Sequence, residues 1–405
     1  MADEKKIRVA VVGDVQINRE DPRSAFVHVL DSLKDGDFRF CQLEATISDQ
    51  GVVRPDVQNP HHRVPPKIIE GLVAAGFNAV TMAGNNNMDY GPEALFDTIK
   101  RLKENGIEAI GAGKNIHEAR QPHYFKIRDV TLAIVDTCSI LREGYAATKT
   151  RAGISPLHVS TFYEPLENIY EQPGTPSRTV TVPNWDDLSA VCNLISEAKS
   201  HADYVIACFH WGVHFTYDLA MYQPDFAYAA IDAGADTVIG THPHCLQAID
   251  TYKNKPIFYS MSNFVFDQPE RHAPQSLKTG YLRFYGFSTE SGARGNPHPR
   301  HCRDTMIVHL TFSKSGITAE ITPAHIGEDA TPRIVDKTTP EGKRIFGLIK
   351  DLNAEWQTDL EETPLGFVLP LRDKGIDTRA LVRKRMMSYP WLYRLKVKEE
   401  QCVSE

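Results

Sequence analysis

The sequence predicts an α/β protein in which layered sheets are flanked by helices. Over the first 260 residues, short apolar runs alternate with stretches that show a helical pattern. Several helical stretches begin with proline and end near glycine, the residues that favour helix starts and stops. Strands that alternate with helices pack as sheets with helices on their outer faces.

The first part of the chain predicts four strands and two helices. The strands are the apolar runs IRVAVVGD, RFCQLEA, NAVTMAG and IEAIGAG. A helix is expected between the second and third runs, in PPKIIEGLVAAGF, and another between the third and fourth, in GPEALFDTIKRLKENG. Pro92 lies near the first turn of the latter helix, where its missing N–H is not needed, and Gly106 lies at its end.

The pattern continues into the second part of the chain. Helices are expected in DDLSAVCNLISEAKSHA and YQPDFAYAAIDAGA, and strands in VTLAIVDTCS, DYVIACFHWG, DTVIGTHPH and PIFYSMSNFVF. Strand alternation returns in DTMIVHLTFSKSGITAEITPAHIG. We therefore expect one domain over residues 1–335, with irregular insertions near 141–183 and 268–303. A helical extension with a basic tail is expected over residues 336–405.

Composition and charge exclude several classes of function. The 405 residues are 41% hydrophobic and 24% charged, and the net charge of −7 gives no indication of nucleic-acid binding. No apolar run is long enough for a transmembrane helix, and the N-terminus lacks the pattern of a signal peptide. The seven cysteines form no C-x-x-C pair. We expect free thiols, no membrane anchor and a cytoplasmic location.

Polar side chains follow one predicted strand after another. The carboxyl ends of strands in an α/β sheet form its ligand crevice, and mixed oxygen and nitrogen donors suit a divalent metal. Taken singly, such groups are often turn residues, solvated carboxylates or packed histidines, but the joint pattern favours a metal site. The groups are Asp14, Glu44, Asn85 to Asn87, His210, His242 and His244.

Several segments resemble the capsule-synthesis CapA family, and the resemblance covers residues 7–268 and the strand near 306. They are GDVQ, QLEA, GNNNMDYGPEAL, HWGVHF, YQPDFAYAAIDAGADTVIGTHPHCLQ and IFYSMSNFVFD. The resemblance implies the calcineurin-like metallophosphatase fold. It also implies that the metal ligands are Asp14, Glu44, Asn86, His210, His242 and His244.

Two positions depart from the pattern that the resemblance implies. Gln16 stands where the wider metallophosphatase motif has histidine, and Asn87 stands where the family has its working histidine. Asparagine cannot transfer a proton near neutral pH, whereas histidine can. Because glutamine is a poor metal ligand, we expect one divalent ion (Ca²⁺, Mg²⁺, Mn²⁺ or Zn²⁺) in place of a two-metal centre.

Capsule-type members act at the membrane, whereas for this chain we expect no anchor, no export signal and long inserted loops. In these respects the chain resembles the lasso-peptide epimerases of this fold. That resemblance implies inversion of the Cα centre of the C-terminal residue of a ribosomally made precursor peptide. Removing and returning a Cα proton requires a base and an acid on opposite faces. The candidates are Asp14 with His298, ahead of His301, on one face and position 87 with Asp89 on the other.

Two other functions remain open on the sequence alone. The same ligands would suit a metal-dependent hydrolase of phosphoester or amide bonds. The chain could also be a poly-γ-glutamate capsule biosynthesis protein that binds a peptide or polymer without catalysis, an interpretation that Gln16 and Asn87 favour. The partner that we expect is a peptide substrate, the precursor peptide, and no nucleic acid.

Overall fold

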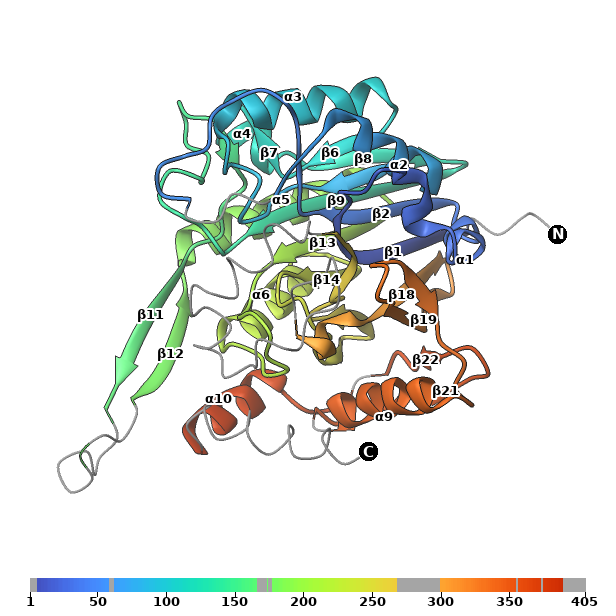
Figure 1. The fold of residues 1–405 in the computed structure, drawn as a ribbon. Helices are drawn as coiled ribbons and strands as arrows, with labels where there is room; N and C mark the ends of the chain where they lie inside the picture. The colour runs from blue at the N-terminus through green and yellow to red at the C-terminus, as the bar shows by residue number, and fades with distance from the viewer. Residues whose placement is uncertain are drawn as a thin grey trace.

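Two β-sheets packed face to face form the centre of the molecule (Figure 1). The computed structural model describes residues 6–57, 62–165, 173, 177–267, 299–354, 356–372 and 374–388. The largest hydrophobic cluster combines side chains of both sheets, such as Val9, Phe40, Leu132 and Ile206. The predicted α/β class, with layered sheets flanked by helices, is confirmed.

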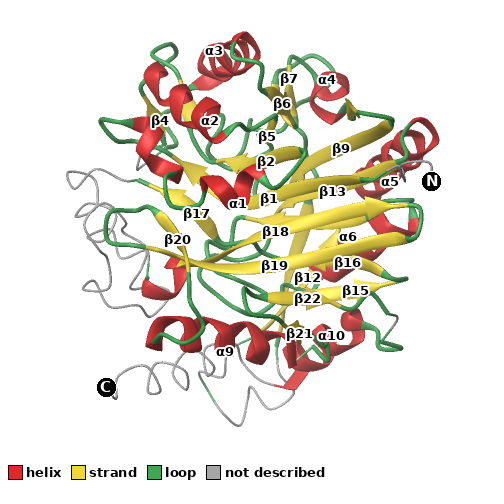
Figure 2. Cartoon of the chain, turned by 90° about the vertical axis from the view of Figure 1, so that its right-hand side faces the viewer, coloured by secondary structure: helices red, strands yellow, loops and turns green. Residues whose placement is uncertain are grey.

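The larger sheet has ten strands and is centred on the N-terminal strand β1 (Ile7–Gln16). One edge of β1 pairs in parallel with β2 (Phe38–Leu43), and β5 (Ala79–Thr81) and β6 (Glu108–Ile110) continue the sheet. Its other edge pairs with β17 and β18, and Figure 2 shows β18 and β19 beside it. The remaining strands are β17 (Asn263–Phe266), β18 (Asp304–Ser313), β19 (Gly316–Ile326), β20 (Pro332–Ile334), β21 (Glu361–Glu362) and β22 (Phe367–Leu369).

The smaller sheet has six strands in the order β15-β16-β14-β13-β9-β8. Strands β9, β13, β14 and β16 run parallel to one another, so their carboxyl ends lie at one edge, whereas β8 and β15 at the two sides are antiparallel. The bounds are β8 (His123–Ile127), β9 (Val130–Cys138), β13 (Tyr204–His210), β14 (Thr237–Thr241), β15 (Ile249–Tyr252) and β16 (Lys255–Phe258).

Helices cover the outer face of each sheet. The larger sheet is covered by η1 (Pro22–Phe26), α1 (Leu30–Lys34), η2 (Pro66–Ile68), α2 (Ile69–Ala75) and α3 (Gly91–Glu104). The smaller sheet is covered by α5 (Trp185–His201) and α6 (Tyr222–Asp232). Helix α9 (Pro340–Ala354) packs against the core between the sheets. The other short elements are β3 (Thr46–Ile47), β4 (Arg63–Val64), β7 (Ala112–Gly113), α4 (Ile116–Arg120), β10 (Gly153–Ile154), η3 (Arg300–Arg303) and α10 (Thr378–Ser388).

Local sequence explains where these helices begin and end. The side chain of Asn184 accepts a hydrogen bond from the N–H of Asp187 and caps α5, and acidic residues occupy the first turn while basic residues occupy the last. Helix α2 ends at Gly76, whose φ of 74° is readily adopted only by glycine. The helix starts and stops predicted from the sequence therefore have the expected physical causes.

Three segments differ from the sequence prediction. The run PIFYSMSNFVF forms two strands in different sheets, β16 and β17, and the chain crosses between them at Ser262, whose φ is 65°. The insertion near 141–183 contains an antiparallel ribbon, β11 (Val159–Glu164) with β12 (Arg178–Pro183), which projects from the body in Figure 1. The segment after residue 335 is not purely helical, because β22 pairs with β19.

Two further predictions concern cysteines and membranes. The six cysteines that the structure describes are free thiols, as expected. Among the described residues we find no helix with the length and apolar character needed to span a bilayer. Most of the second insertion, residues 268–298, lies outside the described part of the chain.

Candidate metal centre

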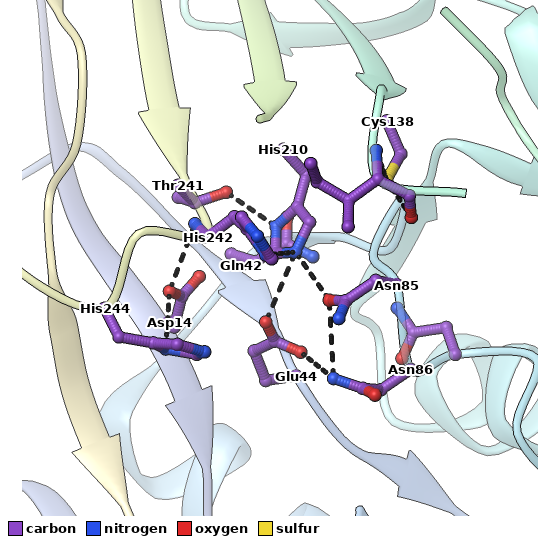
Figure 3. A network of polar contacts seen from close by, with 12 residues as sticks. Asp14, Gln42, Glu44, Asn85, Asn86, Cys138, His210, Thr241, His242 and His244 are labelled. Carbon is purple, nitrogen blue, oxygen red and sulfur yellow. Dashed lines mark hydrogen bonds and ion pairs between the residues drawn. The ribbon is translucent and has the colours of Figure 1, made fainter. Parts of the chain in front are cut away.

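Side chains from both sheets meet where the parallel strands end (Figure 3). The larger sheet contributes Asp14, at an irregularity in β1, and the residues that follow β2 and β5. The smaller sheet contributes the end of β13 and the loop after β14. The residues brought together are Asp14, Glu44, Asn85, His210, His242 and His244.

One group of possible ligands surrounds the Nε2 atom of His210. The Oε1 atom of Glu44 lies 3.3 Å from it, and the Nδ1 atom of His242 lies 3.2 Å from it. The Oδ1 atom of Asn85 is closer still, at 2.9 Å. Within Glu44, His210 and His242, the candidate ligand atoms all lie within 4.8 Å of one another. This spacing suits a single cation with mixed nitrogen and oxygen ligands.

A second group shares Glu44 with the first and adds Asp14 and His244. The Nδ1 atom of His244 lies 3.5 Å from Oδ2 of Asp14 and 2.8 Å from Oδ1 of Asn263. Because a carboxylate has two oxygens, Glu44 can serve both groups at once. Two overlapping groups of possible ligands are therefore present, and the single cation expected from the sequence stays a prediction.

The backbone of the β14 loop is held in an unusual conformation. His242 and His244 both have positive φ values, 94° and 59°, which cost energy for residues other than glycine. This conformation directs both imidazoles into the cluster, with Pro243 between them. The backbone N–H of His242 also donates to Oδ2 of Asp14, at 3.3 Å, and links the two sheets. Such strain is typical of functional sites.

The electrostatics of the cluster fit a bound cation. Asp14 and Glu44 are both fully buried. Burial raises the pKa of Glu44 to about 7 and also raises that of Asp14, and burial lowers the pKa values of His210 and His242. Among the described residues, Oδ1 of Asp14 and Oε1 of Glu44 have no hydrogen-bond partner. A divalent cation would offset these costs and use the orphaned oxygens as ligands.

The three asparagines have different roles from those predicted. Asn85, interpreted from the sequence as a turn residue, directs its oxygen toward His210. Asn86, expected to bind metal through its oxygen, instead donates its amide N–H to Oε2 of Glu44 at 3.2 Å. Asn87 donates to the carbonyls of Met82 and Leu43 and stabilises the turn. The predicted roles therefore shift by one residue toward the N-terminus. Asn85, and not Asn86, is the candidate ligand. Asn86, and not Asn87, faces the cluster at the position where the family histidine was expected.

The predicted proton-transfer pairs are not assembled among the described residues. Asp89 accepts a hydrogen bond from the hydroxyl of Tyr145, at 2.6 Å, whereas the bonds of the Asn87 amide go to backbone carbonyls. His298 lies outside the described residues, so its pairing with Asp14 stays a prediction. The Nε2 atom of His301 lies 3.2 Å from the carbonyl oxygen of Phe215.

Two histidines near the cluster were not assigned from the sequence. The ring of His214 lies 4.0 Å from that of His242 and 5.0 Å from that of His244, measured between centroids. In the sequence, His214 could have been found because it lies in HWGVHF, four residues after His210. The Nδ1 atom of His62 lies 3.1 Å from the backbone carbonyl oxygen of Glu44 and 2.6 Å from Oε1 of Gln16. Gln16 therefore belongs to the supporting structure rather than to the ligand set.

Comparisons with known proteins agree with this arrangement. The family model described as "Bacterial capsule synthesis protein PGA_cap" matches residues 8–268. The chain is 28% identical over 385 residues to "PGA biosynthesis protein CapA" of Bacillus subtilis (strain 168), and the match covers 91% of this chain and 84% of that protein. It is 30% identical over 276 residues to "Capsule biosynthesis protein CapA" of Bacillus anthracis, with 66% and 61% covered.

Solved structures include a hypothetical protein from Thermus thermophilus that is similar to this chain. The TM-score is 0.43 and the sequence identity 13%, with 78% of this chain and 99% of that chain covered.

Proposed function

Because the chain belongs to the PGA_cap family of bacterial capsule synthesis proteins, we propose that it is a metal-dependent hydrolase of a polymer of the poly-γ-glutamate type. The observation that carries this proposal is the shared carboxylate of Glu44, which lies in both groups of possible ligands. Neighbouring ligand groups with a common carboxylate are the arrangement by which hydrolases hold two cations.

The proposed roles follow from the contacts described above. Asp14, Glu44, Asn85, His210, His242 and His244 would hold the cations. A bound divalent cation would polarise the bond to be cleaved and lower the pKa of water at the site.

The groups that surround these ligands would support and orient the site. The amide of Asn86 donates to Glu44 and orients it. Thr241 supports the ring of His210, with its Oγ1 atom 3.0 Å from Nδ1. Of the four imidazoles near the ligands, His214 is the one whose residue is partly exposed, although its Nε2 atom is itself buried.

A hydrolysis assay tests the proposal directly. Protein stripped of metal and reloaded with Mn²⁺ or Zn²⁺ is incubated with poly-γ-glutamate, and new amino groups and polymer length are measured. We expect shortening of the polymer that depends on metal and is lost in Glu44→Gln. Glu118→Gln, at a helix remote in sequence from every ligand, is the control with normal activity. Absence of cleavage with either metal would refute hydrolysis of this polymer, and an aryl phosphodiester assayed in parallel would reveal phosphoesterase activity.

The epimerase hypothesis predicts a different product. A peptide substrate incubated in D₂O would gain deuterium at Cα without cleavage, because proton removal and return leave the backbone intact. In the described part of the chain, the amide of Asn87, which was expected on one of the two faces, is instead bound to the carbonyl of Met82. We therefore place this function second. Deuterium gain without polymer shortening would reverse the order.

A further inference from the structure

A buried carboxylate connects the two sheets directly behind the metal centre. Val130, Leu132 and Ile134 of β9 face the core between the sheets, and the two-residue period of a strand puts Asp136 on the same face. Asp136 belongs to the smaller sheet. Its Oδ2 atom nevertheless accepts hydrogen bonds from the N–H groups of Met82, at 3.0 Å, and Ala83, at 2.8 Å, which follow a strand of the larger sheet.

These bonds reach the turn that carries the asparagines. The carbonyl of Met82 accepts hydrogen bonds from the N–H of Gly84, at 2.8 Å, and from the side chain of Asn87, at 2.6 Å. Asp136 therefore fixes the beginning of the turn, and Asn87 closes it. Between these two points lies Asn85, whose oxygen faces His210 across the gap between the sheets.

The same strand also determines the position of His210. Strands β9 and β13 are paired in parallel, with Asp136 opposite Cys208 and Cys138 opposite His210. One residue thus joins the asparagine turn of one sheet to the strand next to His210 in the other. A displacement of Asp136 would change the separation between the two halves of the ligand set.

The carboxylate of Asp136 packs directly against Gly111, where a side chain would collide with it. Gly111 has a φ of 91°, and a Cβ atom at this position would lie 2.2 Å from Oδ2 of Asp136 and 2.9 Å from the Cβ atom of Ala83. Any side chain there would push the carboxylate away from the turn. The requirement for glycine is an observation independent of the hydrogen bonds, and it indicates that the contact depends on close approach.

We propose that Asp136 is a positioning residue for the metal centre, holding Asn85 of the larger sheet in register with His210 of the smaller one. The inference rests on the proposed metal-dependent function. Partners outside the ligand set that orient the ligands typically change metal affinity by about 10- to 100-fold when they are removed.

Metal affinity gives the first test, measured by titration calorimetry with Mn²⁺ on the full chain. Asp136→Ala and Gly111→Ala are expected to bind about 10- to 100-fold more weakly than the wild type. Asp136→Asn keeps an oxygen where the two N–H groups need it and is expected to restore most of the affinity. The matched control is Asp236→Ala. Asp236 is a buried carboxylate that directly precedes β14, at the end of the strands opposite the metal centre, and it accepts a hydrogen bond from the N–H of Val205.

Hydrogen exchange of the metal-free protein gives the second test. In Asp136→Ala and Gly111→Ala the amides of residues 82–90 are expected to exchange faster than in the wild type, and in Asp236→Ala they are not. Unchanged exchange in this segment, or unchanged metal affinity in Asp136→Ala, would overturn the proposal. Should the wild type bind no metal, the proposed function fails, and the exchange measurement alone decides whether Asp136 holds the turn.

Discussion

Replacing Asp89 by asparagine is expected to flatten the dependence of stability on pH. Asp89 is fully buried, and its Oδ2 atom has no hydrogen-bond partner among the described residues. Burial raises the pKa of this carboxyl from 3.8 to about 6, although the hydrogen bond from Tyr145 and the charge of Arg142 act in the opposite direction. The folded protein therefore binds this proton more tightly than the unfolded chain does.

The size of the effect follows from the two pKa values. Below 3.8 the carboxyl is protonated in both states and costs nothing. Above about pH 6 it is ionised in both states, and the folded state carries the cost of a buried charge. The difference between the folded and unfolded pKa values of Asp89 corresponds to about 3 kcal/mol of unfolding free energy, at about 1.4 kcal/mol per pKa unit. Between pH 4 and pH 8 the wild type loses about 2.4 kcal/mol of unfolding free energy through this group, because part of the loss has already occurred at pH 4; Asp89→Asn does not lose it.

Urea unfolding of metal-free protein, followed by tryptophan fluorescence from pH 4 to pH 8, measures the difference. At pH 4 the unfolding free energy of Asp89→Asn should be lower than that of the wild type, because the asparagine buries an N–H group. As the pH rises, the wild-type value falls, so the two curves should approach each other or cross. Asp129→Asn, at an exposed position, is the control whose curve should parallel that of the wild type. Parallel curves for Asp89→Asn and the wild type would show that burial does not raise this pKa.

Three other outcomes can be checked with standard assays. Asn86→His is expected to raise the hydrolytic rate, because it places an imidazole one turn from Asp89, whose N–H donates to the carbonyl of residue 86 at 3.1 Å. Asn87→His should leave the rate low and reduce the unfolding free energy by about 1–3 kcal/mol, since the carbonyls of Met82 and Leu43 lose a donor. Equal effects of both variants on rate would contradict the revised assignment. Lys374→Met should cost about 3–5 kcal/mol in urea unfolding, because the lysine is paired at 2.5 Å with Asp250, which is fully buried; a loss below about 1 kcal/mol would refute this. Removing metal with a chelator should lower the melting temperature of the wild type in calorimetry but not that of Glu44→Gln, and an equal shift in both would place the metal elsewhere.

Much of the site could be predicted because parallel strands point their carboxyl ends the same way. Asp14, Glu44, His210, His242 and His244 each follow an apolar run, and all five reach the cluster. Their position along the chain was enough to bring them together, since each strand end can lie only at one edge of its sheet. The same reasoning predicted the order of strands and helices.

The asparagine turn could not be predicted to the residue. Which of three adjacent amides faces inward depends on how the turn is rotated. That rotation is fixed by the hydrogen bonds that Asp136, more than fifty residues further along the chain, accepts from the N–H groups of Met82 and Ala83. Likewise, the apolar character of PIFYSMSNFVF does not reveal that the chain leaves one sheet for the other at Ser262. The surroundings of Glu44 are also a tertiary property, because Oε1 lies near His210 at the end of β13 whereas Oε2 accepts a hydrogen bond from Asn86 in the turn.

The central place of β1 has a consequence for synthesis on the ribosome. One edge of β1 is paired by β2, which emerges soon after it, but most of the other edge waits for β18. Residue 304, where β18 begins, follows Gln16 by 288 positions (304 − 16). At typical rates of translation this delay is roughly 15 to 60 s. During that time an almost wholly apolar strand has an open edge, so the nascent chain depends on protection from aggregation until its C-terminal hairpin is made.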